Sequence, residues 1–445
     1  MKVWGAGDVD AAGSAGGTLR VGPKDIVTPL ARERAKDLGV EIVTGSDPST
    51  LSSERIVPPA PSPPPVPVAV KGVAVKDTGS VPGMRPPSGA LFRRGAPLPA
   101  GVAVSGDSGA AGGPGVSGDS GAAGSPGVSG DSGAAGGRVV VIGAGHVGMI
   151  TALRLADADL FSEIVLVDID AGRAEGIALD LTHSAALGGF ATRIRGTGTV
   201  EDAGPADYVV ITAGRARQPG MSRGELVGAN AAIVGDLARR VAATSPDAVI
   251  VVVTNPLDEM TQHAWQSSGF PPERVIGMAG VLDTARFQAL AALATGSRAD
   301  SVDAVALGSH GEEMVMPLSQ ASAGGRPLSS VIGAAELDAI VDRARGSGAE
   351  VVGLLKTGSA FLAPGMSAAR MVLTMARDSG EVMAASVLAD GSYGISDVYV
   401  GLPARLGRGG LKEIVELDLR PEELSALREA ASRISERLGQ LAAVS

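Results

Sequence analysis

Cysteine is absent from this chain of 445 residues, and histidine occurs only four times. Without cysteine the protein can form no disulfide framework, and it has neither a thiolate nucleophile nor a thiolate ligand for a metal. Four histidines also argue against a multi-histidine metal site, so we expect no metal cofactor. Aromatic residues make up only 2% of the chain, which we interpret, with the abundant alanine, glycine and arginine, as a compositional bias.

Positive charge is in deficit. The 38 Lys and Arg residues face 48 Asp and Glu residues, for a formal net charge of −10. This balance opposes non-specific binding to nucleic acid and attraction to an anionic membrane, so we expect neither partner. An anionic substrate would therefore need arginines placed locally at its site.

Long apolar runs are also missing. The chain has no uninterrupted apolar stretch of about twenty residues, and its start is not a basic segment followed by a sustained apolar one. These absences predict a soluble cytoplasmic protein. The hydrophobic fraction of 44% over 445 residues is still ample for a buried core and for two or three domains.

Residues 1–137 differ in composition from the rest of the chain. Thr28 as an N-cap, Pro29 at the first helical position and Gly39 after the last predict one short helix, followed by a strand at residues 40–43. From about residue 58 the chain is rich in proline, which favours extended polyproline conformations, and a Gly- and Ser-rich near-repeat follows. Such a composition cannot offset its chain entropy by burying apolar surface, and it predicts a disordered linker.

The helix that precedes this linker allows two interpretations. It is either a poorly ordered appendage or a docking module that tethers the protein to a partner. Short helices joined to Pro- and Gly-rich linkers resemble the targeting tags of bacterial microcompartment cargo, for which the partner would be the shell.

The stretch 138–168 carries the first chemical signal. An apolar run ends at Gly143-Ala-Gly145-His-Val-Gly148, an apolar helical pattern follows, and a second apolar run ends at Asp168. Gly143 permits the turn, Gly145 lets the backbone approach a pyrophosphate, and Gly148 lets the helix pack on the strand. The helix N-terminus offers free N–H groups to the phosphates. The pattern predicts a dinucleotide site, and an acid at Asp168 favours NAD over NADP, the alternative being a solvated acid at a strand end.

Strands and helices then alternate, which predicts a parallel sheet in a doubly wound α/β domain. Ligands of such sheets bind beyond the carboxyl ends of the strands, which here end at Gly143, Asp168, Ala213 and Asn255. After residue 282 the pattern changes to a second, α+β domain. The elements expected are helices at 174–187, 226–243, 354–375 and 420–441, and strands at 139–142, 164–167, 208–212, 248–253, 301–308, 398–403 and 411–417.

Three further stretches could carry chemistry. The loop 211–223 holds three arginines, whose guanidinium forks suit a carboxylate, unless they are ordinary solvated residues. Asp283 and Arg286 share a face if their segment is helical, and they could equally be a surface ion pair. His310 lies between small residues at the end of an apolar strand, where it is either structural or catalytic.

Taken together, these stretches resemble the lactate/malate dehydrogenase family, and more closely its malate branch. The resemblance runs from residue 138 to the C-terminus. Its motifs occur in the family's order: VIGAGHVG, ITAGRARQPGMSR, VTNPLD, MAGVLDTARF, GSHGEEMV and LLKTGSAFLAP.

The resemblance implies roles for individual residues. His310 would be the catalytic acid and base, Asp283 the acid that orients it, and Arg223 the loop arginine that polarises the substrate carbonyl. Arg286 would hold the substrate carboxylate, and Asn255 would contact substrate. The positions associated with cofactor binding are Gly143, Ala144, Gly145, His146, Val147, Gly148, Asp168, Asn230, Val253 and Asn255.

Arg217 indicates the substrate. At this position the family has arginine in malate enzymes and glutamine in the usual lactate enzymes, and a second arginine suits a four-carbon dicarboxylate because an unpaired buried carboxylate is costly. The chain departs from the family's pattern at Gln218, where a basic residue is common, at Glu312, where aspartate is common, and by an extra residue near Met316.

The sequence therefore predicts a disordered extension at 1–137, a Rossmann-type NAD-binding domain at 138–282 and a catalytic α+β domain at 283–445. The expected activity is NAD-dependent, reversible oxidation of malate to oxaloacetate, a reaction of the tricarboxylic acid cycle. The alternatives are a lactate or other 2-hydroxyacid dehydrogenase and, from another class, a non-catalytic NAD-binding scaffold. The family resemblance also implies a homodimer or homotetramer.

Overall fold

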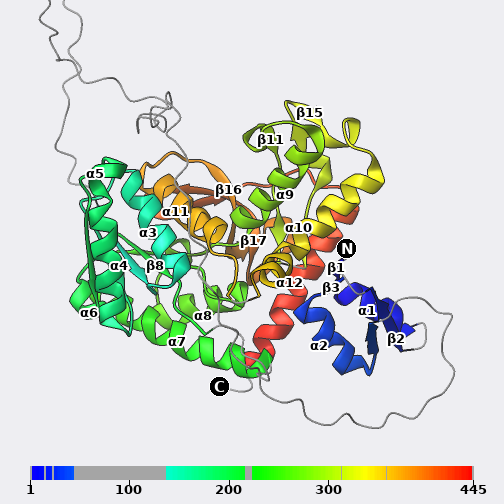
Figure 1. Cartoon of the computed structure of the whole chain (residues 1–445), viewed down its shortest axis with the longest axis horizontal. Coiled ribbons are helices and arrows are strands. Elements are labelled where there is room, and N and C mark those ends of the chain that lie inside the picture. Colours follow the sequence, from blue (N-terminus) through cyan, green and yellow to red (C-terminus); the bar gives the residue numbers. More distant parts are fainter. Residues whose placement is uncertain are drawn as a thin grey trace, which may run out of the picture. The chain divides into compact units, whose positions relative to one another are not determined.

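The computed structural model describes residues 3–14, 17–22, 25–44, 137–215, 223–311, 313–356 and 358–442. Several features of the sequence lie outside these ranges: the Pro-rich segment, the Gly- and Ser-rich near-repeat, Arg217, Gln218 and Glu312. Figure 1 shows the elements of the described residues in sequence colours.

Residues 3–44 contain the predicted helix and strand. Helix α2 (Pro29–Leu38) is capped by the Thr28 side chain, which accepts the Ala31 N–H at 3.1 Å, and ends at Gly39 with a φ of 67°. Strand β4 (Glu41–Thr44) follows and pairs in parallel with β2 (Thr18–Val21). The structure adds α1 (Ala6–Ser14) and a short parallel pair, β1 (Val3–Trp4) with β3 (Ile26–Val27). Their few apolar residues gave no periodic signal, yet they enclose a small core of Val9, Leu19, Val21, Val27, Ala31, Ala35 and Val40.

The parallel half of the large sheet confirms the doubly wound prediction. Its strands run in the order β7-β6-β5-β8-β9-β10, so the chain order reverses between β5 and β8. Ligands bind at such a reversal, beyond the carboxyl ends of the strands. The strands are β5 (Arg138–Ile142), β6 (Glu163–Val167), β7 (Arg193–Thr197), β8 (Tyr208–Ile211), β9 (Val249–Val252) and β10 (Val275–Gly277).

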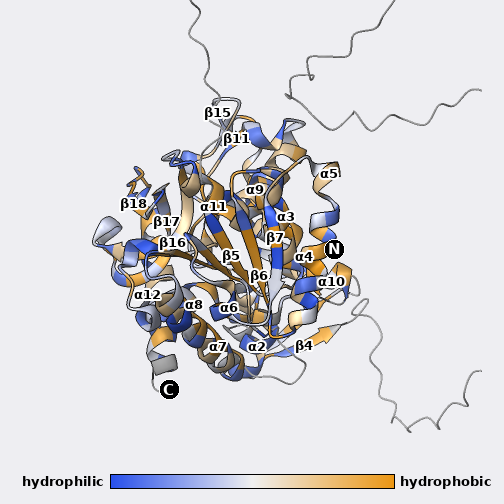
Figure 2. Ribbon diagram, turned by 90° about the vertical axis from the view of Figure 1, so that its left-hand side faces the viewer, coloured by the Kyte–Doolittle hydropathy of each residue, from blue (hydrophilic) through white to orange (hydrophobic). Residues whose placement is uncertain are grey.

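Both faces of this half are apolar. Successive side chains of a strand point to opposite faces, so the continuous valine and isoleucine runs predict helices on each side. Val139 and Val141 pack into one core cluster, whereas Val140 and Ile142 pack into another. Figure 2 shows β5 and β6 mainly in the colour of apolar residues. The helices are α3 (His146–Asp157), α4 (Ala171–His183), α5 (Ala185–Gly188), α6 (Val200–Ala203), α7 (Arg223–Thr244) and α8 (Leu257–Ser268).

The sheet continues past residue 282 without a break. Gly277 of β10 pairs antiparallel with Ser386 of β16, and β16 pairs with β17. Strand β17 also pairs with β12 and β18, and β12 pairs with β13. Among the described residues, eleven strands therefore form one sheet. The strands of this second part are β11 (Val302–Asp303), β12 (Leu307–Gly308), β13 (Met314–Val315), β14 (Ser322–Ala323), β15 (Arg326–Pro327), β16 (Val382–Asp390), β17 (Ser396–Gly407) and β18 (Gly410–Ile414).

The helices of the second part correct one prediction. The prediction of a single helix at 354–375 is wrong. Helix α10 (Ala334–Leu355) ends just before Lys356, which has a φ of 63°, and α11 (Leu362–Ala376) begins six residues later. Positive φ at Lys356 and at Gly358 breaks the helical path. The predicted C-terminal helix is confirmed as α12 (Pro421–Ala442), and α9 (Gly280–Thr295) precedes β11.

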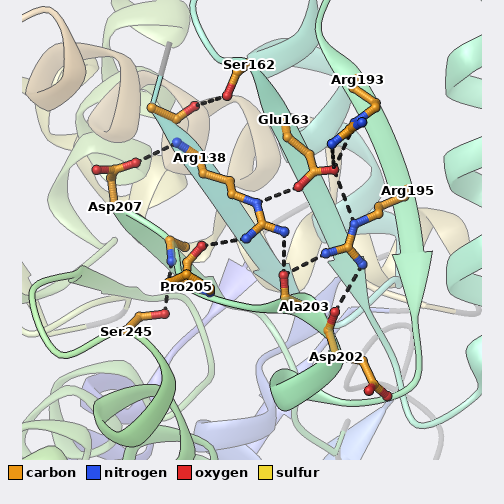
Figure 3. Close-up of polar contacts among 12 residues, drawn as sticks. Arg138, Ser162, Glu163, Arg193, Arg195, Asp202, Ala203, Pro205, Asp207 and Ser245 are labelled. Carbon is orange, nitrogen blue, oxygen red and sulfur yellow. Dashed lines mark hydrogen bonds and ion pairs between the residues drawn. The ribbon is translucent and has the colours of Figure 1, made fainter. Parts of the chain in front are cut away.

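A buried carboxylate pairs with arginines at the amino ends of three parallel strands (Figure 3). Arg138, Glu163 and Arg193 begin β5, β6 and β7 and lie side by side in register. Glu163 is 5% exposed and pairs with Arg138 at 2.5 Å, Arg193 at 3.0 Å and Arg195 at 3.2 Å. Burial alone would raise the pKa of Glu163, but the bond and charge of Arg138, with the other arginines, hold it below its usual value.

Candidate active site

The glycine loop between β5 and α3 has the geometry that its sequence predicts. Gly143 has a φ of 105°, a conformation that side chains disfavour, and a Cβ built on Gly148 would lie 1.9 Å from the Gly143 carbonyl oxygen. A Cβ on Gly145 would meet no protein atom within 4 Å, so the loop is open on that side. Helix α3 starts there without a side-chain cap. Its first N–H groups therefore suit a pyrophosphate, and the residues fit a dinucleotide.

Other residues of this loop contact protein groups. Ala144 is buried. The His146 ring lies 4.9 Å from that of Phe361, which immediately precedes α11. Val147 lies in the first turn of α3, and its carbonyl oxygen accepts a hydrogen bond from the Thr151 hydroxyl. The ring contact places the start of α3 against the residue that precedes α11.

Asp168 lies directly beside the loop. One carboxylate oxygen accepts the Ala144 N–H at 2.8 Å, and the other accepts the Asp170 N–H at 3.1 Å. The side chain is half-buried and follows the last residue of β6. Its position next to the loop is the one at which a ribose hydroxyl is recognised in folds of this type.

The ends of β8 and β9 are joined by Asn230 of α7. Its amide oxygen accepts the Arg215 N–H at 2.7 Å, and its amide nitrogen donates to the Asn255 carbonyl at 2.7 Å. The Asn230 side chain is 2% exposed, so it braces two loops at the switch point. Val253 is half-buried and Asn255 is exposed at the carboxyl end of β9, next to a cis peptide bond with Pro256.

His310, Asp283 and Arg286 come together from separate elements. Asp283 and Arg286 lie one turn apart on α9, and His310 follows β12. Asp283 accepts from Arg286 Nη1 at 3.2 Å with one oxygen, and its other oxygen is 2.9 Å from His310 Nδ1. Asp283 is 1% exposed and the Arg286 side chain 14%. The interpretation of Asp283 and Arg286 as a surface ion pair is therefore wrong.

The carboxylate determines the state of the imidazole. Burial alone would lower the pKa of His310, but the Asp283 charge and its hydrogen bond outweigh burial and raise the pKa above its ordinary value. A carboxylate only accepts hydrogen bonds, so the proton of the neutral ring is on Nδ1. Nε2 is then left to exchange a proton with a substrate oxygen.

Asp258 of α8 accepts hydrogen bonds from the loop that carries His310, and sequence reasoning missed this residue. It accepts the His310 N–H at 3.2 Å, the Ser309 hydroxyl at 3.1 Å and the Ser386 hydroxyl at 2.7 Å. Asp258 is 1% exposed. Burial, with the neighbouring Glu259 charge, raises its pKa to about 6. The one signal in the sequence was a pair of acids between the apolar Leu257 and Met260 at the start of α8.

The remaining predicted site residues belong to the arginine loop. Arg217 lies outside the described residues. Arg223 is the first residue of α7, and only its backbone is described. The structure therefore brings together the histidine, its acid and the Arg286 guanidinium, and leaves the contacts of the other two arginines undescribed.

The described residues contain no group of three or more His, Cys, Asp or Glu side chains arranged to hold a metal ion. None of the helices in these ranges is long and apolar enough to cross a membrane.

The sequence matches two family models. The model of the lactate/malate dehydrogenase NAD-binding domain matches residues 137–277, and that of the alpha/beta C-terminal domain of the same family matches residues 280–444. Both matches lie beyond the N-terminal extension.

Curated relatives carry the name malate dehydrogenase. The protein of Pelodictyon phaeoclathratiforme is 43% identical over 305 residues, which are 68% of this chain and 98% of the relative. The protein of Thermomicrobium roseum is 46% identical over 299 residues, 67% of this chain and 96% of the relative.

Solved structures give the same picture. Malate dehydrogenase from Salinibacter ruber is 39% identical with a TM-score of 0.66, covering 69% of this chain and 98% of that one. Lactate dehydrogenase from Cryptosporidium parvum, solved with lactic acid and NAD, is 36% identical with a TM-score of 0.66, covering 68% and 97%.

Proposed function

This chain belongs to the lactate/malate dehydrogenase family, and from that premise we propose that it is an NAD-dependent malate dehydrogenase. The observation that carries the proposal is the buried Asp283 carboxylate, which bonds both His310 and Arg286. One acid thereby holds an acid–base group and a carboxylate-binding group at a fixed separation, as a 2-hydroxy acid requires.

The cofactor would lie along the glycine loop, with its adenosine ribose at Asp168. Bound NAD supplies the site with a hydride acceptor, and its reduced form with a hydride donor. The open side of Gly145 and the uncapped start of α3 fit the pyrophosphate. Asp168 would bond the ribose hydroxyls and repel a 2′-phosphate.

In the proposed reduction, C2 of oxaloacetate accepts the hydride while His310 donates the Nε2 proton to the carbonyl oxygen. Malate forms, and the imidazole is left neutral. In the oxidation, His310 takes the hydroxyl proton and becomes an imidazolium, which the Asp283 charge stabilises. The raised pKa of His310 suits both directions near neutral pH.

The arginines would bind the substrate and assist the charge change. Arg286 Nη1 contacts Asp283, so its fork is oriented and can bind the carboxylate next to C2. The family resemblance assigns Arg223 to the developing charge on the carbonyl oxygen. It assigns Arg217 to the second carboxylate, and Asn255 to a further substrate contact.

Comparing turnover of oxaloacetate and pyruvate with NADH tests this proposal. We expect oxaloacetate to be preferred, and we expect Arg217→Gln to lower its kcat/KM by about a hundredfold or more, since an unpaired carboxylate would remain in the closed site. A preference for pyruvate would make the chain a lactate dehydrogenase. Folded protein that binds NAD and turns over neither substrate would instead be a scaffold.

We also propose that the enzyme is cytoplasmic and assembles as a homodimer or homotetramer. Its NAD-binding domain would span residues 138–282 and its catalytic domain residues 283–445. Residues 1–137 would tether this enzyme to a docking partner. Deleting them should leave its folding and activity intact, whereas an inactive or unfolded product would make the extension part of the enzyme's fold. Light scattering of the pure protein gives the oligomeric state.

A further inference from the structure

Arg437 of α12 is half-buried at the centre of a charged cluster. Its side chain is 18% exposed and donates in three directions: Nε to Glu259 at 2.5 Å, Nη1 to Glu313 at 2.7 Å, and Nη2 to the Ser309 hydroxyl at 3.1 Å. Glu259 is on α8, while Ser309 and Glu313 lie on either side of His310. One guanidinium thus joins the C-terminal helix to α8 and to both flanks of the histidine loop.

The bond to Ser309 continues toward the histidine. The Ser309 hydroxyl accepts from Arg437 and donates to Asp258 at 3.1 Å, and the same Asp258 oxygen accepts the His310 N–H. In such a chain each bond polarises and strengthens the next. Arg437 is therefore connected to the backbone of His310 through two intervening side chains, those of Ser309 and Asp258.

The histidine loop needs such ties because glycines flank the histidine. Gly308 has a φ of 78° and Gly311 a φ of 93°, and glycine restrains the backbone less than any other residue. The position of the His310 ring against Asp283 then depends on side-chain bonds. In the described part of this loop, the side-chain hydrogen bonds other than that of the His310 ring run to Asp258 and Arg437.

We propose that Arg437 is a positioning residue, which holds residues 308–313 so that the His310 ring stays against Asp283. The inference rests on the proposed function, in which His310 transfers the proton. Arg437 does not touch the reacting atoms. Among the described residues, the charged groups that face His310 or its loop from the packed elements are Asp283 and Arg286 of α9, Asp258 and Glu259 of α8, Glu313 of the loop, and Arg433 and Arg437 of α12.

The test replaces Arg437 with methionine, which has similar reach and no charge. We expect kcat with oxaloacetate to fall about tenfold or more, because a small displacement of the proton donor is costly. The KM for NADH should stay within about twofold, because the glycine loop is unaffected. The pKa of His310, followed by NMR of the full-length protein, should fall by at least about half a unit as its contact with Asp283 loosens.

Arg433 provides the matched control. It lies one turn earlier on α12, also faces Glu313 at 3.5 Å, and bonds Glu429, but its side chain is 50% exposed. Arg433→Met should leave kcat and the pKa of His310 unchanged. A loss equal to that of Arg437→Met would mean that the effect follows from losing any positive charge on this helix face, and would overturn the proposal.

A double variant separates positioning from stability. Glu259→Met with Arg437→Met removes the buried pair together, so thermal stability should return toward that of the unchanged protein. If Arg437 positions the loop, kcat and the pKa of His310 stay low in the double variant. Recovery of both would overturn the proposal, as would unchanged values in Arg437→Met. If Arg437→Met does not fold, kcat and the pKa of His310 in the double variant provide the test.

The NMR titration needs no turnover, and His310→Asn identifies the signal among four histidines. If the protein turns over neither malate nor oxaloacetate, the proposed function fails, whereas a fall of the His310 pKa still supports the positioning role. A rise of that pKa in Arg437→Met would mean that Arg437 acts only through its charge, and would overturn the inference.

Discussion

Replacing Asp283 with asparagine removes the charge that faces the His310 imidazole and keeps a side chain of the same shape. The carboxylate is 1% exposed and 2.9 Å from Nδ1, so solvent screens it little. Its main effect in the proposed mechanism is to hold the imidazolium form of His310. The variant should therefore lower the pKa of His310 and move the pH dependence of the reaction.

The geometry gives the size of the effect. Two unit charges about 4 Å apart interact by about 4 kcal/mol at an effective dielectric constant of about 20, which corresponds to roughly 3 pKa units. Arg286 acts in the same direction, because its charge at 3.2 Å from Asp283 Oδ1 would no longer be balanced. The asparagine amide retains part of the hydrogen bonding. We expect a net fall of about 2 units.

The assay is the pH profile of kcat/KM for oxaloacetate with NADH. Reduction needs the imidazolium, so activity falls as the pH rises through the pKa of His310, and this limb should move about 2 units toward acid. At a pH well above the pKa of His310 in the unchanged protein, the loss is then about a hundredfold. The reaction's equilibrium constant fixes the ratio of the two directions, so malate oxidation must lose the same factor at that pH.

Asp300→Asn is a suitable control, because Asp300 pairs with Arg298 on the exposed surface. It should leave the profile unchanged. An Asp283→Asn profile whose limb stays at the original pH would refute the reasoning, since Asp283 would then not set the pKa of His310.

The raised pKa also has a consequence for stability: the contribution of the His310–Asp283 pair is fully present below about pH 6.5 and is lost as the pH rises through the raised pKa.

Two predictions concern groups outside the reaction centre. Asp168→Ser should narrow the preference for NADH over NADPH in kcat/KM by about tenfold or more, because the carboxylate that repels a 2′-phosphate is gone; an unchanged ratio would contradict that role. Glu163→Gln should lower the free energy of unfolding in urea by about 2 kcal/mol at neutral pH, since the half-buried Arg138 loses its charged hydrogen-bond acceptor. Because the pKa of Glu163 is lowered, its contribution is present above about pH 4.5 and lost as the pH falls through the depressed pKa, so the two proteins should converge in acid. Its place at the amino ends of the strands predicts unchanged kcat.

Much of the parallel half could be predicted because its signals are local. The runs of valine and isoleucine in β5, β6, β8 and β9 mark strands buried on both faces, and Gly143 to Gly148 mark a turn into a helix. The second part was harder. Helix α10 starts at Gly333 without a side-chain cap, and β16 lacks strict alternation. In an alanine-rich sequence, neither the spacing of the apolar residues in these elements nor the residues at their ends gave a distinct signal.

The sequence by itself determined the dinucleotide loop, the acid at Asp168 and the types of residue at the reaction centre, because each of these depends on a few neighbouring residues. Only the tertiary structure decided how His310 is held. Its loop is bonded by Asp258 and Arg437, and Asp258 in turn accepts the Ser386 hydroxyl. These three residues are far apart in the sequence, and no local pattern links them. Residue types and spacing limit the chemistry that a chain can perform, whereas burial and through-space contacts determine which acid is charged and which loop is fixed.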